Sequence, residues 1–162
     1  KTARVWRIDG SHVRTLAGHG KQVDSVCVTP DGEYVLTGSG DDTARVWRLD
    51  DGAHVCTLKG HSSCVHSVCV SSDGKHVVTG SKDKTARVWR LDDGAHVRTF
   101  KGHRSWVLSV CVTPNGKHVV TGARDKTARV WRIDGSHVRT LAGHGKQVDS
   151  VCVTPDGDST TA

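Results

Sequence analysis

The sequence of 162 residues contains no methionine and only one tyrosine and one phenylalanine. The absence of Met is expected of a chain that has lost its own start or is a fragment. Because phenyl rings are so scarce, we expect a core built from Val, Leu, Cys and Trp. No run of about 18 apolar residues occurs, so we expect no membrane-spanning helix and no membrane partner.

Charge of one sign is not strongly dominant. The net charge is +6, from 23 Lys and Arg against 17 Asp and Glu. This balance favours acidic partners only weakly, because a repeated unit multiplies whatever charge it carries. The chain also lacks a basic stripe interleaved with aromatic residues, so nucleic acid is not the expected partner.

The six cysteines do not form a disulfide pattern. Four of them occupy one equivalent position in a repeated SVCV string: Cys27, Cys69, Cys111 and Cys152. That regularity favours small apolar residues over paired cysteines. Cys56 and Cys64 have no counterparts, and we expect all six to be reduced, in the cytoplasm or in the nucleus. No CxxC or Cys/His pair has zinc spacing, so no metal or cofactor is expected.

Repetition is the strongest signal in the chain. One string of 32 residues occurs twice, as Lys1–Gly32 and as Lys126–Gly157. The string TARVWR begins at Thr2, Thr43, Thr85 and Thr127, which is a period of 41 or 42 residues. Each unit contains four short β-branched runs separated by Gly- and Asp-rich turns, which predicts an all-β chain of four-stranded antiparallel sheets. Such small sheets become stable by stacking on their neighbours.

A period of this length, with Gly-His early and Trp late in each unit, resembles the WD-repeat β-propeller family. The resemblance covers Lys1 to Gly157 and implies a β-propeller with about four blades per chain. With strands lettered A to D outward from the ring axis, residues 20–61, 62–103 and 104–144 are the expected complete blades. Residues 1–19 would supply strands C and D of a split blade, and residues 145–162 its strand A and a degenerate strand B. Ala162 would then stand at the position of the repeated strand B threonine.

The split blade can be completed in more than one way. The family's rings are usually seven- or eight-bladed, so we expect two chains to exchange ends and to form an eight-bladed homodimer. A single chain could instead close on itself as a four-bladed ring. The sequence could also be a slice of a longer natural array.

The resemblance further implies a buried hydrogen-bonded network in each complete blade, made by a His, a Thr, an Asp and a Trp. The matching residues are His19, Thr37, Asp41 and Trp47; His61, Thr79, Asp83 and Trp89; and His103, Thr121, Asp125 and Trp131. Trp6 and His144 would belong to an incomplete set. The His and Asp superficially resemble a catalytic set, but repetition in every blade favours a structural role, and no enzyme activity is expected.

Positions that differ between the otherwise similar repeats are the candidate binding residues. The resemblance places them on the top face of the ring: Gln22, Asp24 and Gly40; Cys64, His66 and Lys82; Trp106, Leu108 and Arg124; and Gln147 and Asp149. Trp106 is the one Trp outside strand C, and it is either an exposed anchor or an extra core residue.

Two groups of histidines are expected to be ordinary surface residues. His66 and Cys64 lie two apart on one strand, so they would share a face, but two possible ligands are weak evidence for a metal. The histidines that open strand D are expected to titrate normally: His12, His54, His96 and His137.

The expected function is a non-catalytic scaffold that presents the top face to a protein or peptide. The alternative is a structural, self-assembling repeat protein with no specific ligand, which near-identity among the repeats favours.

Overall fold

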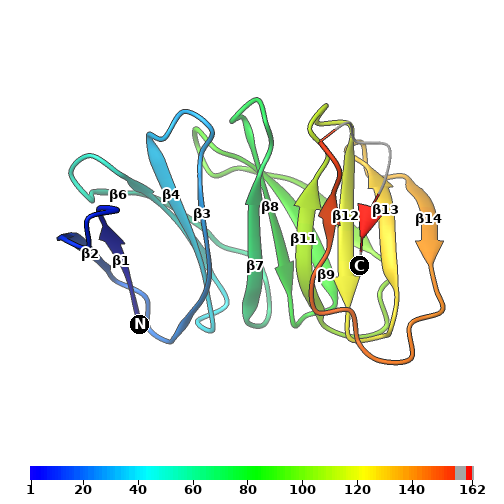
Figure 1. Cartoon of the computed structure of the whole chain (residues 1–162). Helices are drawn as coiled ribbons and strands as arrows, with labels where there is room; N and C mark the ends of the chain where they lie inside the picture. Colours follow the sequence, from blue (N-terminus) through cyan, green and yellow to red (C-terminus); the bar gives the residue numbers. More distant parts are fainter. Residues whose placement is uncertain (156–159, 162) are drawn as a thin grey trace.

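The computed structural model describes residues 1–155 together with Thr160 and Thr161. In this part of the chain the regular elements are sixteen β-strands, and no helix is long and apolar enough to cross a membrane. Three sheets have four strands each, and a two-stranded sheet lies at either end of the chain. Figure 1 shows the sheets side by side in an arc, with the N-terminal strands at one end and the C-terminus toward the other.

Each four-stranded sheet is an antiparallel meander formed by consecutive strands. Blade 1 contains β3 (Val23–Val28), β4 (Tyr34–Ser39), β5 (Ala44–Arg48) and β6 (His54–Leu58). Blade 2 contains β7 (Val65–Val70), β8 (His76–Ser81), β9 (Thr85–Arg90) and β10 (His96–Lys101). Blade 3 contains β11 (Val107–Val112), β12 (His118–Ala123), β13 (Ala128–Arg132) and β14 (His137–Leu141).

The two-stranded sheets are half-blades. The N-terminal half-blade contains β1 (Thr2–Trp6) and β2 (His12–Ala17), and the C-terminal half-blade contains β15 (Cys152–Val153) and β16 (Thr160–Thr161). Cys152 pairs with Thr161 as Cys27 pairs with Leu36 in blade 1, so β15 and β16 have the register of strands A and B. The half-blades remain separate sheets, and the described chain is an open arc (Figure 1). The expected position of Ala162 lies outside the described residues.

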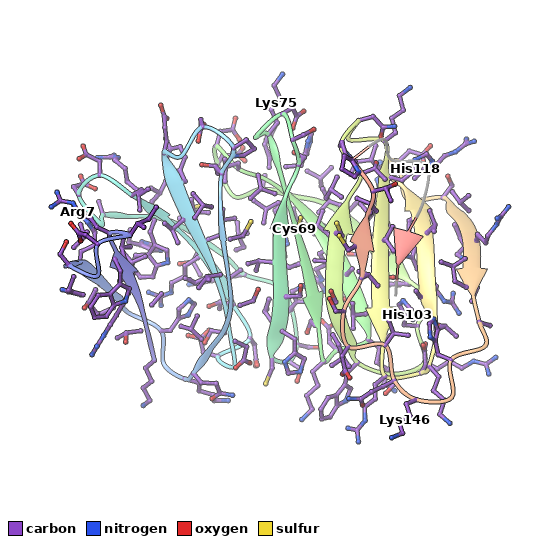
Figure 2. All side chains as sticks on the ribbon, in the orientation of Figure 1. Arg7, Cys69, Lys75, His103, His118 and Lys146 are labelled. Carbon is purple, nitrogen blue, oxygen red and sulfur yellow. The ribbon has the colours of Figure 1, made fainter. Side chains whose placement is uncertain are left out.

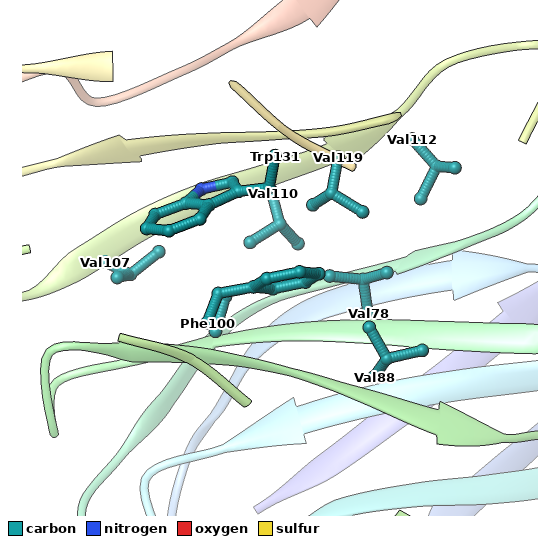
Figure 3. Close-up of a cluster of buried hydrophobic side chains, with 9 residues drawn as sticks. Val78, Val88, Phe100, Val107, Val110, Val112, Val119 and Trp131 are labelled. Atoms are coloured by element: carbon teal, nitrogen blue, oxygen red, sulfur yellow. The ribbon is translucent and has the colours of Figure 1, made fainter. Parts of the chain in front are cut away.

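The core lies between successive blades, because each strand D places a large apolar side chain on the Trp of the next blade. Phe100 of β10 lies against Trp131 of β13, with ring centroids 5.5 Å apart (Figure 3). Leu58 and Trp89 share the preceding core cluster, and Leu16 and Trp47 the one before it. The central strands β4, β8 and β12 are buried on both faces, which explains their runs of Val, Leu, Thr and Gly.

Glycine marks the closest approach between blades. A Cβ atom on Gly80 of β8 would lie 2.8 Å from Val107 Cγ1 and 2.9 Å from Val110 Cγ1, both in blade 3. The repeat places Gly38 and Gly122 at the equivalent contacts, so a larger residue there would push neighbouring blades apart.

A hydrogen bond joins each pair of neighbouring inner strands. The Oγ atoms of Ser25, Ser67 and Ser109 accept bonds from the backbone N–H groups of Val68, Val110 and Val151, each at 3.1 Å. The bonds span 43, 43 and 42 residues of sequence. Each links one strand A to the next, so the serine of SVCV holds the blades in register.

The first blades of the arc expose apolar groups that are covered elsewhere. Trp6 is 53% exposed, whereas Trp89 is 1% exposed. Val26 is 60% exposed, whereas Val68, its equivalent in blade 2, is 6% exposed. In the described chain no blade precedes Trp6, and the half-blade that precedes Val26 lacks a strand B like the one that covers Val68.

Candidate interaction surface

Each complete blade contains the same buried set of hydrogen bonds. In blade 2 the His61 imidazole bonds Asp83 Oδ2 through Nδ1 and Thr79 Oγ1 through Nε2, both at 2.7 Å. The indole Nε1–H of Trp89 donates to Thr79 Oγ1 at 2.9 Å. The corresponding bonds in blade 1 are 2.8, 2.7 and 2.8 Å, and in blade 3 they are 2.9, 2.7 and 2.9 Å.

The polar groups of each set satisfy one another within the blade. A neutral imidazole with its proton on Nδ1 donates to the carboxylate, and the threonine hydroxyl then donates to Nε2 while accepting from the indole. Burial acts to raise the pKa of Asp83, but hydrogen bonds from His61 and Thr85 outweigh it and hold this pKa well below its usual range. The hydroxyl of Thr79 has 0% exposure, so no substrate can reach it.

The incomplete set is not assembled in the described chain. Trp6 is half exposed, and the half-buried His144 bonds neither a threonine nor a carboxylate among the described residues. Among residues 1–155, the network therefore exists only in the three complete blades.

The three networks point toward one face of the arc, the top face, which carries the Gly-His loops and the Asp turns. In Figure 2 this face lies at the bottom, where Lys146 is labelled with His103 above it, and Lys75 and His118 lie toward the opposite face. Glycine is required in the Gly-His loops: Gly60 has a φ of +150°, and a Cβ there would meet Arg87 and Trp89.

A β-bulge in strand A of each complete blade supplies one of the variable residues. The register jumps between Val23 and Ser25 in β3, and at the equivalent steps in β7 and β11. The residues skipped by these jumps are Asp24, His66 and Leu108. A bulge re-aims a side chain out of the regular alternation, so variation at these positions leaves the sheet unchanged.

Trp106 lies at the centre of a cluster drawn from two blades. The Lys82 Nζ atom lies 4.2 Å from the Trp106 ring centroid, and the Arg124 guanidinium carbon lies 4.7 Å from it. The His66 imidazole stacks on the same indole, with centroids 5.8 Å apart and an interplanar angle of 28°. Cations at these distances are attracted to the electron-rich face of an indole. We call Lys82, His66, Trp106 and Arg124 the Trp106 cluster.

The cluster extends into blade 1 through His66. The Nδ1 atom of His66 lies 3.6 Å from Asp24 Oδ2, so contacts run continuously from Asp24 across three blades to Arg124. Trp106 is half-buried: its ring packs on its neighbours while part of it faces solvent.

The remaining variable residues make side-chain contacts of their own. Cys64 Sγ donates to the carbonyl of Gly40 at 3.6 Å, and the exposed Gln22 side chain lies over Gly40. Gln147 donates to Asp149 at 2.8 Å. Cys64 and His66 thus contact different groups, and no set of three metal-ligating side chains occurs in the described residues. Leu108 is half-buried on β11.

The expectation of normal titration is wrong for two outer-strand histidines. Burial, followed by the nearby guanidinium of Arg45, lowers the pKa of His54. Burial and Arg87 lower the pKa of His96 in the same way. Each of these rings lies edge-on to the Trp of its own blade, with centroids 5.4 and 5.3 Å apart.

Comparison with known proteins identifies the repeat. The family described as "WD domain, G-beta repeat" matches residues 10–48, 52–90 and 94–132. Two solved structures, "Crystal structure of RRP9 WD40 repeats" and "Structure of U3-55K", superpose with a TM-score of 0.82 at 28% identity. Each match covers 85% of this chain and 44% of the other.

Curated relatives match over shorter stretches. The small ribosomal subunit protein RACK1 of Caenorhabditis elegans is 39% identical over 59 residues, which are 30% of this chain and 18% of that protein. The nuclear distribution protein PAC1 of Ajellomyces capsulatus is 41% identical over 49 residues, which are 30% of this chain and 11% of that protein. This chain therefore spans less than a fifth of these relatives. The family match covers well over half of the chain and agrees with its four-stranded blades, and the chain belongs to the WD-repeat β-propeller family.

Proposed function

We propose that this chain is a non-catalytic scaffold that binds a protein or peptide through its top face, with Trp106 as the anchor. Domains of this family are typically protein-interaction scaffolds and generally non-catalytic. One observation carries the proposal: residues that differ between the repeats come together around Trp106, although they belong to different blades.

The composition of the cluster supports a binding role. Trp and Arg are the residue types most enriched among side chains that dominate interface energies. The surrounding framework supplies rigidity, because the buried networks and the serine bonds hold each loop on a packed blade. A rigid surface loses little conformational entropy when a partner binds.

Affinity capture tests this proposal. Immobilised wild-type chain and the Trp106→Ala variant are exposed to the same proteome, and bound proteins are quantified by mass spectrometry. We expect a defined set of proteins to be lost from Trp106→Ala. The matched control is Tyr34→Ala, a half-buried aromatic at the start of β4, which should retain them. Equal capture by wild type and Trp106→Ala would remove the anchor role.

We also propose that two copies close an eight-bladed ring by completing each other's split blade. The two ends of the arc are complementary in chemistry. Leu141 of β14 occupies the position of Phe100, and Trp6 occupies the position of Trp131, so Leu141 can lie on Trp6 of a second copy. Ser150 likewise stands where Ser67 does, and the backbone N–H of Val26 where that of Val110 does.

A structural, self-assembling repeat protein is the second candidate function. The observation that favours it is the identity of Lys1–Gly32 with Lys126–Gly157, because blades selected for separate contacts would differ more. Capture of no specific protein by the wild-type chain, together with ring closure, would favour this function over the scaffold.

A reducing compartment, either the cytoplasm or the nucleus, is the proposed location. Its support is that all six cysteines are free in the structure.

A further inference from the structure

The three Asp turns of the top face share a backbone but differ in charge. The turns are Gly40-Asp41-Asp42 in blade 1, Lys82-Asp83-Lys84 in blade 2 and Arg124-Asp125-Lys126 in blade 3. The third residue of each turn has a positive φ, of 70°, 71° and 66° respectively. The same backbone geometry therefore carries no cationic side chain in the turn of blade 1 and two cationic side chains in each turn of blades 2 and 3.

The aspartates of these turns do not neutralise the flanking cations. Asp83 accepts bonds from His61 and the backbone N–H of Ser62 through Oδ2, and from Thr85 through Oδ1. Asp125 accepts the equivalent bonds in blade 3, including one from the backbone N–H of Arg104 at 2.8 Å. Because these carboxylates bond inward, the charge left facing solvent in blades 2 and 3 is positive.

Lys82 and Arg124 are held against one ring without an acidic partner. Neither side chain forms an ion pair with a carboxylate in the part of the chain that the structure describes. The positive charges of Lys82 and Arg124 repel each other, and an anion placed between them is attracted by both. The nearest acidic group of the contact series is Asp24, which lies on the far side of His66 and limits the positive surface to blades 2 and 3.

We propose that the Trp106 cluster binds a carboxylate-rich peptide segment, an inference that rests on the scaffold function proposed above. The Arg124 guanidinium can hold one carboxylate through two parallel bonds, and Lys82 can bind a second one as a point charge. Trp106 positions both cations. Nucleic acid fits this surface less well, because His66, Lys82 and Arg124 already occupy the ring on which a base would stack.

Fluorescence anisotropy with a dye-labelled peptide of consecutive glutamates tests the inference. The glutamine version of the peptide and a thymidine oligonucleotide serve as comparison probes. We expect the glutamate peptide to bind best, with an affinity that falls as salt is added. The double variant Lys82→Glu/Arg124→Glu should bind it at least about tenfold more weakly.

A matched charge reversal on the opposite face provides the control. Lys75 and Lys117 are exposed in the turns that precede β8 and β12, so Lys75→Glu/Lys117→Glu changes net charge equally and should bind nearly as wild type. Circular dichroism checks the fold of each variant, and Lys82→Gln/Arg124→Gln supplies a milder change that should also weaken binding.

Three results would overturn the inference: no binding of the glutamate peptide by the wild-type chain, equal loss in both charge-reversal variants, or tighter binding of the oligonucleotide. The affinity capture separates this failure from failure of the scaffold function. If proteins are captured in a Trp106-dependent manner while the glutamate peptide does not bind, only the proposal of a carboxylate-rich ligand is contradicted. If neither occurs, both proposals fall.

Discussion

The Oγ atom of Ser67 accepts a hydrogen bond from the backbone N–H of Val110 at 3.1 Å, across the boundary between blade 2 and blade 3. Replacing Ser67 by Ala leaves this N–H without a partner between packed sheets. We expect the variant to lose about 1 kcal/mol of unfolding free energy, measured by urea denaturation. Ser62→Ala is the control, because the Ser62 side chain is exposed in a loop.

Ser150→Ala extends this comparison to the proposed seam. Ser67 bonds strand A of the next blade, which is blade 3. In the described chain Ser150 is exposed, and no later strand A is present to bond it. If a second copy closes the ring, Ser150→Ala should lose about as much stability as Ser67→Ala, again about 1 kcal/mol. An unchanged free energy of unfolding for Ser150→Ala would argue against the seam.

The mass in solution tests ring closure independently. We expect multi-angle light scattering to give twice the chain mass of 17.4 kDa for a polypeptide of these 162 residues. Trp6→Asp should shift this species toward the monomer, because a charge would replace the indole expected to lie on Leu141. Trp6 is already 53% exposed in the single chain, so the substitution should leave its blades folded. A wild-type mass of one chain would contradict closure by a second copy and leave the four-bladed ring of one chain and the longer array as the alternatives.

Thr79→Val should destabilise the protein strongly. The substitution keeps the shape of the side chain but removes the partner of both the Trp89 indole N–H and the Nε2 atom of His61. Two buried polar groups without partners are expected to cost about 2–4 kcal/mol, measured by urea denaturation. Thr99→Val in the same blade is the control, because its partner His96 is exposed. Equal effects of the two substitutions would contradict the structural importance of the network.

Acid should destabilise the fold in two steps. Burial lowers the pKa of His103, as well as those of His54 and His96, in the folded state. As pH falls below about 6.5, these histidines therefore bind protons more readily in the unfolded chain than in the folded one. Hydrogen bonds that outweigh burial lower the pKa of Asp83. The stability that ionised Asp83 contributes is therefore fully present above about pH 4 and is lost as pH falls further. In both windows the folded state holds fewer protons, so unfolding free energy rises with pH. Urea denaturation at a series of pH values checks this, and greater stability in acid would contradict it.

Much of the fold could be predicted from the sequence, because the period of TARVWR and the turn residues dictate four strands per unit. The bulges could not, since a one-residue jump at His66 breaks the alternation on which strand predictions depend. The contact of Trp106 with Lys82 depends on how far blade 3 is rotated from blade 2, which the repeat does not encode locally. The serine of SVCV was visible in every unit, but its partner lies one blade away.

Hydrogen exchange of a captured protein complex tests the scaffold account most directly. We expect protection of amides in the top-face segments 62–66, 82–84, 104–108 and 124–126, with little change in the opposite turns 72–75 and 114–117. The pattern should disappear in Trp106→Ala, because the anchor is lost while the blades remain folded. Protection confined to the opposite turns, or protection that persists without the Trp106 side chain, would contradict binding through the Trp106 cluster.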